Sequence, residues 1–333
     1  MYTGTSTPLL RVSNLNVEYS VRNHHSITAV DNLSLEIPSS GYTLGLVGES
    51  GSGKSSLGMG IMNSIEPPGR ISSGSVEYNG QEILKIPPEK LRAYRWEEVS
   101  MIYQSAMNSL NPVKTAADHI VEVLVQHRKT PKPEARKEAL KLLSQVGIKP
   151  ERANNFQHQL SGGMRQRVVI AMALALSPKL LIADEPTSAL DVVVQRQILS
   201  LLKKNVRERN LSLLFITHEI AILRGLVDHI AVMYKGAIVE RGPLQKVLDE
   251  PLHPYTEMLL DSLLTIDEDP KNNVATSTEK SASVRDSPRI EAGTNYCKYV
   301  GLCKYAFERC KVEKPVLQKI GQGDRLVACH KYA

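Results

Sequence analysis

Long apolar runs are absent from this sequence of 333 residues. The longest candidate, Val168–Leu176, stops at Ser177-Pro178 and is much shorter than the ~18 apolar residues that a membrane-spanning helix needs. The first residues, Met1 to Pro8, have neither a basic start nor an apolar signal core, so we expect the chain to stay in the cytoplasm. The net charge of +6 is modest and dispersed, and it does not by itself indicate nucleic-acid binding.

Cysteine is missing from the first 296 residues, and all four cysteines lie in the last 37. A segment rich in Asp, Ser, Thr and Lys, Thr265–Glu291, precedes them and predicts a polar linker. Two disulfides are unlikely in a cytosolic protein, so metal binding is the better explanation for Cys297, Cys303, Cys310 and Cys329. The gaps between them are wider than the Cys pairs of most zinc sites, but spacing alone leaves zinc and an iron–sulfur cluster equally possible.

A phosphate-binding pattern is present at Gly48–Ser55, which matches GxxxxGK(S/T) at every fixed position. Its glycines let backbone N–H groups turn inward around an anion, and Lys54 can reach the β- and γ-phosphates while the Ser55 hydroxyl ligates Mg²⁺. The flanks fit, because Tyr42–Val47 predicts a buried strand and Ser55–Met62 a helix. The predicted nucleotide-contacting residues here are Gly48, Glu49, Ser50, Gly51, Ser52, Gly53, Lys54, Ser55 and Ser56.

An α/β fold surrounds this loop in the prediction. Leu9–Tyr19 and Val30–Ile37 indicate an N-terminal antiparallel β-layer, and the chain is helical from Pro112 to about Ser177, an insert of about residues 105–177. The other predicted strands are Ile71–Tyr78 with a hairpin turn at Asn79-Gly80, Val99–Tyr103, Leu180–Asp184, Leu211–Thr217, and a closing hairpin of Ile230–Tyr234 and Ala237–Glu240. A helix at Val194–Arg209 makes a βαβ unit with a parallel sheet. We expect a nucleotide-binding domain over 1–264, a linker over 265–294 and a Cys-rich tail over 295–333.

Hydrolysis needs more than phosphate binding, and Asp184 and Glu185 supply the missing groups. Asp184 ends a buried strand, where a carboxylate can hold Mg²⁺, and Glu185 follows it as a candidate general base facing the γ-phosphate. The pair could also cap a helix that has Pro186 in its first turn. The two interpretations are compatible, and the phosphate loop favours the catalytic one.

Leu160–Gln166, with the letters LSGGMRQ, resembles the signature of ATP-binding cassette (ABC) ATPases. The resemblance covers about residues 9–262 and implies roles for matching positions. Gln104 matches a glutamine that contacts magnesium and water, His218 a switch histidine, and Ser188–Asp191 a dimer-contact loop. Tyr19, at the end of the first strand, matches an aromatic residue that stacks on adenine.

The same resemblance implies partners. Ser161 and Gly163 of a second cassette, identical or different, would complete the ATP site of the first, and separate transmembrane subunits would bind the helical insert near Gln104. The protein would then lie peripherally on the cytoplasmic face of the membrane, and an extracytoplasmic substrate-binding protein would act with it indirectly. Nucleic acid is not an expected partner.

Two short stretches, Ser109–Pro112 and His253–Thr256, together with the four-Cys tail, are similar to the dipeptide/oligopeptide importer type of ABC ATPase. That similarity favours a four-iron four-sulfur cluster over zinc. Oligosaccharide or nickel import remains an alternative, as does a non-transport ABC ATPase acting on DNA or the ribosome. Proteins of the latter class usually have coiled coils, two cassettes in one chain or an N-terminal ferredoxin-like segment, and none of these is present.

Overall fold

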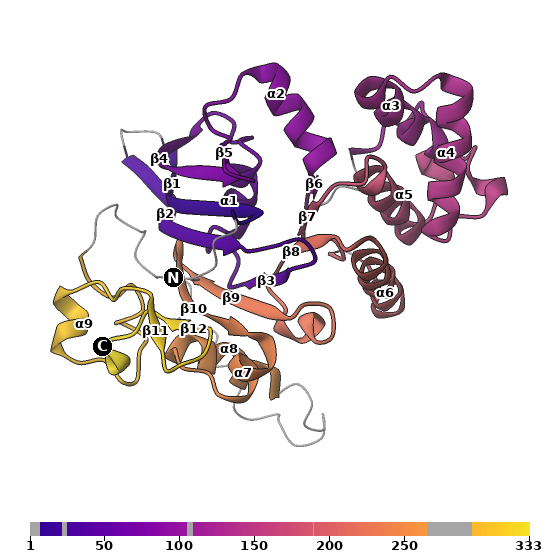
Figure 1. Cartoon of the computed structure of the whole chain (residues 1–333). Helices are drawn as coiled ribbons and strands as arrows, with labels where there is room; N and C mark the ends of the chain where they lie inside the picture. The colour runs from indigo at the N-terminus through magenta and orange to yellow at the C-terminus, as the bar shows by residue number, and fades with distance from the viewer. Residues whose placement is uncertain (1–6, 22–24, 105–108, 189, 265–294) are drawn as a thin grey trace.

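The computed structural model of the chain describes residues 7–21, 25–104, 109–188, 190–264 and 295–333. Within these ranges the strands form two sheets, one ordered β2-β1-β4-β5 and the other β11-β12-β10-β9-β3-β8-β7-β6 (Figure 1). The predicted linker over 265–294 and the first four residues of the predicted insert lie outside the described residues.

The four-stranded sheet is the predicted antiparallel N-terminal layer. It consists of β1 (Leu10–Val21), β2 (His25–Ile37), β4 (Gly69–Tyr78) and β5 (Gln81–Glu82). The β4–β5 hairpin turns at Asn79 and Gly80, both with positive φ, as the Asn-Gly pair predicts. β1 is central, because it pairs with both β2 and β4.

The eight-stranded sheet carries a parallel core. Its strands are β3 (Thr43–Val47), β6 (Val99–Ile102), β7 (Leu180–Asp184), β8 (Ser212–Thr217), β9 (His229–Tyr234), β10 (Ala237–Pro243), β11 (Gln318–Ile320) and β12 (Arg325–Val327). β6, β7, β8, β3 and β9 run parallel to one another, and α6 (Val192–Arg209) joins β7 to β8. The predicted βαβ unit is confirmed.

The sequence predicted that the hairpin of β9 and β10 closes the sheet, and this is wrong. The hairpin forms, but β12 pairs with the outer side of β10 and β11 pairs with β12. Strands of three residues give no periodic signal. Their pairing is accompanied by a tertiary contact, the ion pair between Arg325 of the tail and the fully buried Glu240.

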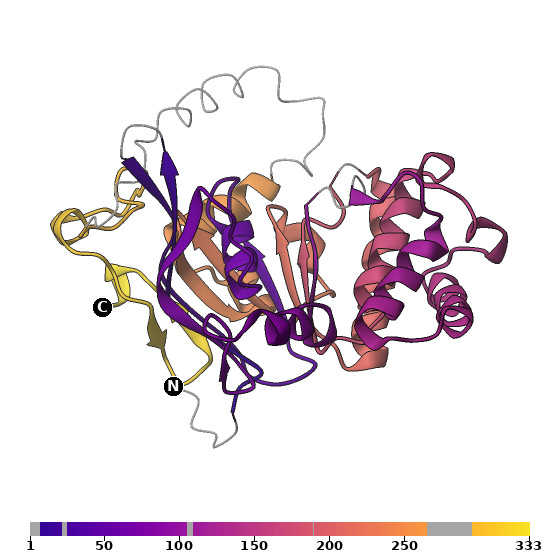
Figure 2. The same cartoon turned by 90° about the horizontal axis from the view of Figure 1, so that it is seen from above.

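The helices complete the layers. They are α1 (Lys54–Ile61), α2 (Pro88–Ala93), α3 (Ala116–Arg128), α4 (Lys132–Gln145), α5 (Gly162–Leu174), α6, α7 (Leu244–Asp249), α8 (Pro254–Leu264) and α9 (Glu308–Val312), with a π turn at Tyr94–Glu98 and 3₁₀ turns at Pro150–Arg152, Gln157–Gln159, Ile220–Leu223 and His330–Tyr332. α3 to α5 form the helical insert, which lies at the opposite end of the molecule from the tail (Figures 1 and 2). Thr115 and Asp118 form a capping box that starts α3.

The parallel strands are apolar on both faces because helices and strands cover both sides of the sheet. Along β7, Leu180 and Ile182 pack with α1 and the β-layer, whereas Leu181 and Ala183 pack with the helices on the other side. Burial on both faces fixes the position of β7 along the sheet. It therefore also fixes the position of Asp184, the last residue of the strand. In the part of the chain that the structure describes, no helix combines the length and apolar character needed to cross a bilayer.

Candidate functional site

The predicted phosphate loop, Gly48–Ser55, connects β3 to α1 as the sequence indicates. Gly53 has φ +101°, and a Cβ there would lie 1.9 Å from the Ala29 carbonyl oxygen. A Cβ at Gly48 would lie 2.1 Å from the Met233 carbonyl oxygen. Glycine is therefore required at both positions, because the loop packs tightly against the strands around it.

Lys54 lies buried inside the loop. Its Nζ donates hydrogen bonds to the Gly48 carbonyl at 2.7 Å, the Glu49 carbonyl at 2.8 Å and the Ser52 hydroxyl at 3.3 Å. Burial lowers the pKa of Lys54, and the carboxylates of Glu185 and Asp184 oppose that shift. The ammonium is thus held where the loop would surround a phosphate.

Asp184 ends β7, and its side chain is nearly inaccessible. Burial raises the pKa of Asp184, while a hydrogen bond from the Ser55 hydroxyl lowers it. Its Oδ1 atom is buried and has no hydrogen-bond partner among the described residues. A hard divalent cation prefers oxygen ligands of this kind, so Asp184 and Ser55 fit a Mg²⁺ ion.

Glu185 meets Gln104 and His218 in one cluster. Its Oε1 lies 2.8 Å from His218 Nδ1, and its Oε2 accepts a hydrogen bond from Gln104 Nε2 at 3.0 Å. The three residues follow β7, β6 and β8, which are neighbours in the sheet, so their carboxyl ends open on one edge. Three predicted site residues distant in sequence therefore lie together.

Tyr19 and Ser56 also lie together. The Tyr19 hydroxyl is 3.2 Å from Ser56 Oγ, one residue beyond the phosphate loop. The Tyr19 ring is packed over Gly69, where an added Cβ would come within 2.6 Å of Cε1. The ring thus lies next to the start of α1. Stacking on adenine remains a prediction.

The signature residues belong to a different part of the chain. Ser161 caps α5, because its Oγ accepts the Met164 N–H at 3.3 Å, and its side chain is exposed. Gly163 packs against Val194 of α6, since a Cβ there would lie 2.5 Å from that side chain. Figures 1 and 2 show α5 in the helical insert, apart from α1, so within one chain the signature and the phosphate loop form separate half-sites.

The predicted dimer-contact loop, Ser188–Asp191, follows Glu185 closely. Ser188 donates from its hydroxyl to the Glu185 carbonyl at 3.0 Å, and Asp191 caps α6 by accepting the Val194 N–H at 2.9 Å. Ala189 lies outside the described residues. The loop is therefore tied at one end to the candidate base and at the other to a helix.

The four tail cysteines line one small cavity. None forms a disulfide, and burial raises the pKa of Cys297 to about 11. Over the described residues, no group of three or more His, Cys, Asp or Glu side chains has the arrangement that holds a metal ion. The tail thus brings its four thiols to one cavity.

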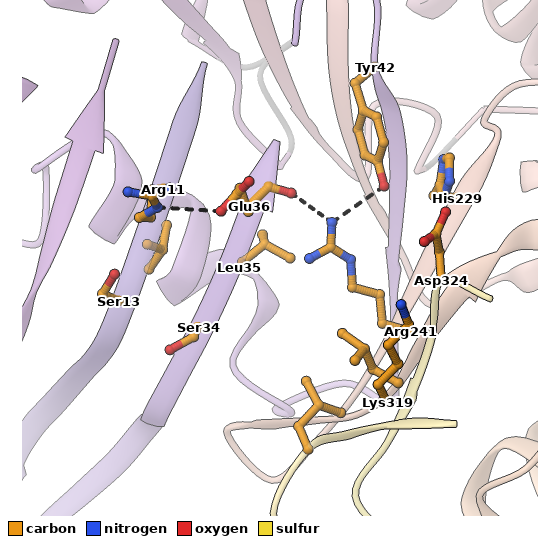
Figure 3. A pocket seen from close by; sticks show the side chains of 13 residues that line it. Arg11, Ser13, Ser34, Leu35, Glu36, Tyr42, His229, Arg241, Lys319 and Asp324 are labelled. Carbon is orange, nitrogen blue, oxygen red and sulfur yellow. Dashed lines mark hydrogen bonds and ion pairs between the residues drawn. The ribbon is translucent and has the colours of Figure 1, made fainter. Parts of the chain in front are cut away.

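A larger cavity, of about 500 Å³, lies between the β-layer, β9–β10 and the tail hairpin (Figure 3). Arg241 crosses it and donates to the Glu36 carbonyl at 2.7 Å and to the Tyr42 hydroxyl at 3.3 Å. The Tyr42 ring stacks on His229 with centroids 4.5 Å apart. None of the predicted site residues lines this cavity, which is a seam between three parts of the fold.

Sequence reasoning missed one residue that touches the phosphate loop. The hydroxyl of Tyr255, which is fully buried in α8, accepts the Glu49 N–H at 2.9 Å. In the sequence, His253–Thr256 indicates only a subfamily. The one available signal was a tyrosine within a distinctive motif, and nothing in the sequence connects it to residue 49.

Comparison with known proteins agrees with this geometry. A family model described as ABC transporter matches residues 30–188, and one described as the C-terminal region of oligopeptide/dipeptide transporters matches residues 239–310. The dipeptide transport ATP-binding protein DppD of Escherichia coli is 41% identical over 325 residues, which are 97% of this chain and 96% of that protein. The oligopeptide transport ATP-binding protein AppD of Bacillus subtilis is 41% identical over 327 residues, 97% of each chain.

Solved structures show the same fold. A dimeric ATP-binding cassette in a post-hydrolysis state with bound ADP and Pi superposes with a TM-score of 0.63 at 28% identity, covering 71% of this chain and 98% of that one. A cassette from Clostridium perfringens that is part of an ABC transporter complex gives a TM-score of 0.62 at 28% identity, covering 73% and 91%. With the relatives above, these matches show that the chain belongs to the ABC transporter ATPase family.

Proposed function

We propose that this chain is the ATP-hydrolysing subunit of a peptide importer. The observation that carries the proposal is the similarity of about two residues in five, over nearly the whole chain, to dipeptide and oligopeptide transport ATP-binding proteins. The match of residues 239–310 to the C-terminal region of such transporters favours peptides over oligosaccharides or nickel. It also favours transport over action on DNA or the ribosome.

Each residue of the half-site has a task in hydrolysis. Lys54 binds the β- and γ-phosphates. To do so, its ammonium gives up its hydrogen bonds to the Gly48 and Glu49 carbonyls and contacts phosphate oxygens instead. When bound, Mg²⁺ neutralises charge on those phosphates, and Asp184, Ser55 and Gln104 would hold it. Glu185 accepts a proton from the attacking water as general base.

His218 and Gln104 position the Glu185 carboxylate. Each contacts one of the two carboxylate oxygens, and each oxygen keeps a further lone pair that can accept a hydrogen bond. A carboxylate fixed at both oxygens loses little rotamer freedom when water and γ-phosphate arrive. The arrangement suits an in-line attack from that edge.

Two cassettes are needed for a complete site. The exposed Ser161 and the start of α5 offer a hydroxyl and free backbone N–H groups, so the signature of one cassette would cover the γ-phosphate held by its partner, which is identical or a paralogue. ATP then closes the pair and hydrolysis opens it. We place the pair on the cytoplasmic face of the membrane against separate transmembrane subunits, with an extracytoplasmic substrate-binding protein acting through them.

We further propose a domain division of 1–264, 265–294 and 295–333, with an iron–sulfur cluster in the tail. Support comes from the four thiols, which line one cavity and form no disulfide. A zinc ion needs all four sulfurs about 2.3 Å from one point, whereas a cluster spreads its thiolate ligands over four irons. Cys297, Cys303, Cys310 and Cys329 would be those ligands.

Anaerobic purification tests the cluster. We expect brown protein with about four irons and matching sulfide per chain, and Cys303→Ser should lose the colour. Colourless protein with one zinc per chain would replace the cluster by a zinc site. Metal-free protein with four reactive thiols would contradict both.

Glu185→Gln tests the function. The amide keeps the shape of the side chain but cannot accept the proton, so ATP should bind and turnover should fall by about 10²–10⁴-fold. The variant should accumulate as an ATP-bound dimer, measured by light scattering with and without nucleotide. Lys54→Ala is the matched comparison, since it should lose ATP binding and dimerise no better than apo protein. An ATPase rate for Glu185→Gln near that of wild type would remove Glu185 as the base.

A further inference from the structure

Tyr255 ties a helix outside the half-site to the phosphate loop. Its hydroxyl accepts the N–H of Glu49, the second residue of the loop. Burial raises the pKa of Tyr255, so the hydroxyl stays neutral. Because a phosphate loop works by aiming its N–H groups at the ligand, a fixed N–H at one end restricts the orientation of the others.

The ring of Tyr255 packs against the tail. Tyr299 lies between the first two tail cysteines and is buried, with its ring centroid 5.5 Å from Tyr255 and 5.3 Å from Tyr234. Tyr234 and Tyr255 are themselves 4.5 Å apart. The rings of Tyr234 in β9, Tyr255 in α8 and Tyr299 in the tail therefore form one aromatic cluster, and Tyr255 connects it to Glu49.

A second contact runs through a single peptide group. Lys298 donates from Nζ to the Lys235 carbonyl at 2.6 Å, and the Gly236 N–H of the same peptide bond donates to the Ser52 carbonyl at 2.9 Å. A cation on the carbonyl polarises the peptide and strengthens the bond made by its N–H. Lys298 and Tyr299 are adjacent, so one short tail segment reaches the phosphate loop by two routes.

The start of α8 is fixed from the tail as well. Glu240 accepts the N–H groups of Leu252 and His253 while it pairs with Arg325 at 2.8 Å. His253 Nδ1 in turn accepts the Tyr255 N–H at 3.0 Å. The tail hairpin thus holds the segment that positions Tyr255.

We propose that Tyr255 and Lys298 are positioning residues for ATP, through which the tail sets the shape of the phosphate loop and so the affinity for nucleotide. This inference rests on the proposed function, because it takes ATP as the ligand of the loop. It assigns the tail a task in ATP binding that does not require a redox reaction. A change in the tail alters nucleotide affinity without touching Glu185.

Tyr255→Phe in the full-length protein is the first test. It removes one hydroxyl and keeps the ring, so we expect the Kd for a fluorescent ATP analogue with Mg²⁺ to rise by about three- to tenfold, the range of one lost buried hydrogen bond. KM for ATP should rise in the same proportion with kcat nearly unchanged. Tyr78→Phe is the matched control. Its hydroxyl also makes a part-buried hydrogen bond, to Glu98 at 2.9 Å, but does not touch the loop, so its Kd should stay within about twofold of wild type.

Lys298→Met tests the second route. Lys298 and Lys314 both pair with Asp31 at 2.6 Å. Lys298 also donates a hydrogen bond to the Lys235 carbonyl, which makes Lys314 its matched control. Lys298→Met should weaken ATP binding by a similar factor, whereas Lys314→Met should not. Tyr299→Ala should also weaken binding, and Tyr299→Phe should restore it because the ring is what packs on Tyr255.

Unchanged ATP affinity in both Tyr255→Phe and Lys298→Met would overturn the proposal. Equal loss in the Tyr78 and Lys314 controls would also overturn it, because general destabilisation would then explain the effect. These results differ from a failure of the proposed function. In that case the wild-type protein itself would not bind ATP, and Lys54→Ala would change nothing.

Discussion

The cassette and the tail are held together by different forces. In the cassette, both faces of the central sheet bury continuous apolar clusters. In the described part of the tail, the buried apolar side chains are those of Tyr299, Cys310, Val327 and Ala328, while Leu302, Phe307, Val312 and Val316 are exposed. The tail is joined to the cassette by ion pairs, hydrogen bonds and a few rings. The difference indicates that apolar burial stabilises the cassette, whereas the tail depends on its contacts with the cassette.

Removing the buried tie between the two regions should have the largest effect. Glu240→Ala removes the buried carboxylate that pairs with Arg325, leaves that arginine only its contacts with Glu250, and frees two backbone N–H groups, so we expect a loss of about 3–5 kcal/mol. Urea unfolding measures the loss, and limited proteolysis should find the tail hairpin cut first. Glu257→Ala is the control. It removes a pair with Lys304, whose side chain is 62% exposed, so solvent screening should make the loss much smaller than that of Glu240→Ala. Equal effects of the two variants would mean that the buried tie does not join the regions.

A leucine pair compares the two kinds of packing directly. Leu214 in β8 is fully buried, and Leu302 in the tail is 54% exposed. Leu214→Ala should lower the free energy of unfolding by about 2–5 kcal/mol because it leaves a cavity. Leu302→Ala should change it by less than about 0.5 kcal/mol. Thermal unfolding followed by circular dichroism tests both, and a large loss at Leu302 would show that the tail has an apolar core of its own.

A small, salt-dependent effect is expected at the edge of the tail. Lys314→Met removes one of the two lysines that bind Asp31 and lower its pKa against the opposing effect of burial. Since Lys314 is about one-third exposed, the loss should be at most about 1 kcal/mol at low salt and smaller at 1 M salt. Urea midpoints at the two salt concentrations measure it. A loss independent of salt would mean that the lysine acts through packing of its stem.

Local patterns were enough to predict much of the fold and site. The phosphate loop, the Asp184–Glu185 pair and the parallel strands are short-range features, because glycine freedom, strand burial and charge spacing act within a few residues. The hairpin at Asn79-Gly80 is another case. Each was located in the sequence to within a few residues of its position in the structure.

Three features lay beyond the sequence. Gln104, Glu185 and His218 follow three different strands, so no local rule determines their hydrogen bonds, and their meeting was expected only from the family resemblance. The pairing of β12 with β10 comes with a buried ion pair between residues 85 apart in sequence, which no local pattern indicates.

The third is the contact between Tyr255 and Glu49, which are 206 residues apart in sequence. The sequence by itself determined which residues can bind phosphate and accept a proton, because that capacity is local chemistry. Only the tertiary structure decided which other groups hold these residues in position, because burial and hydrogen bonding between distant segments are properties of the packed chain.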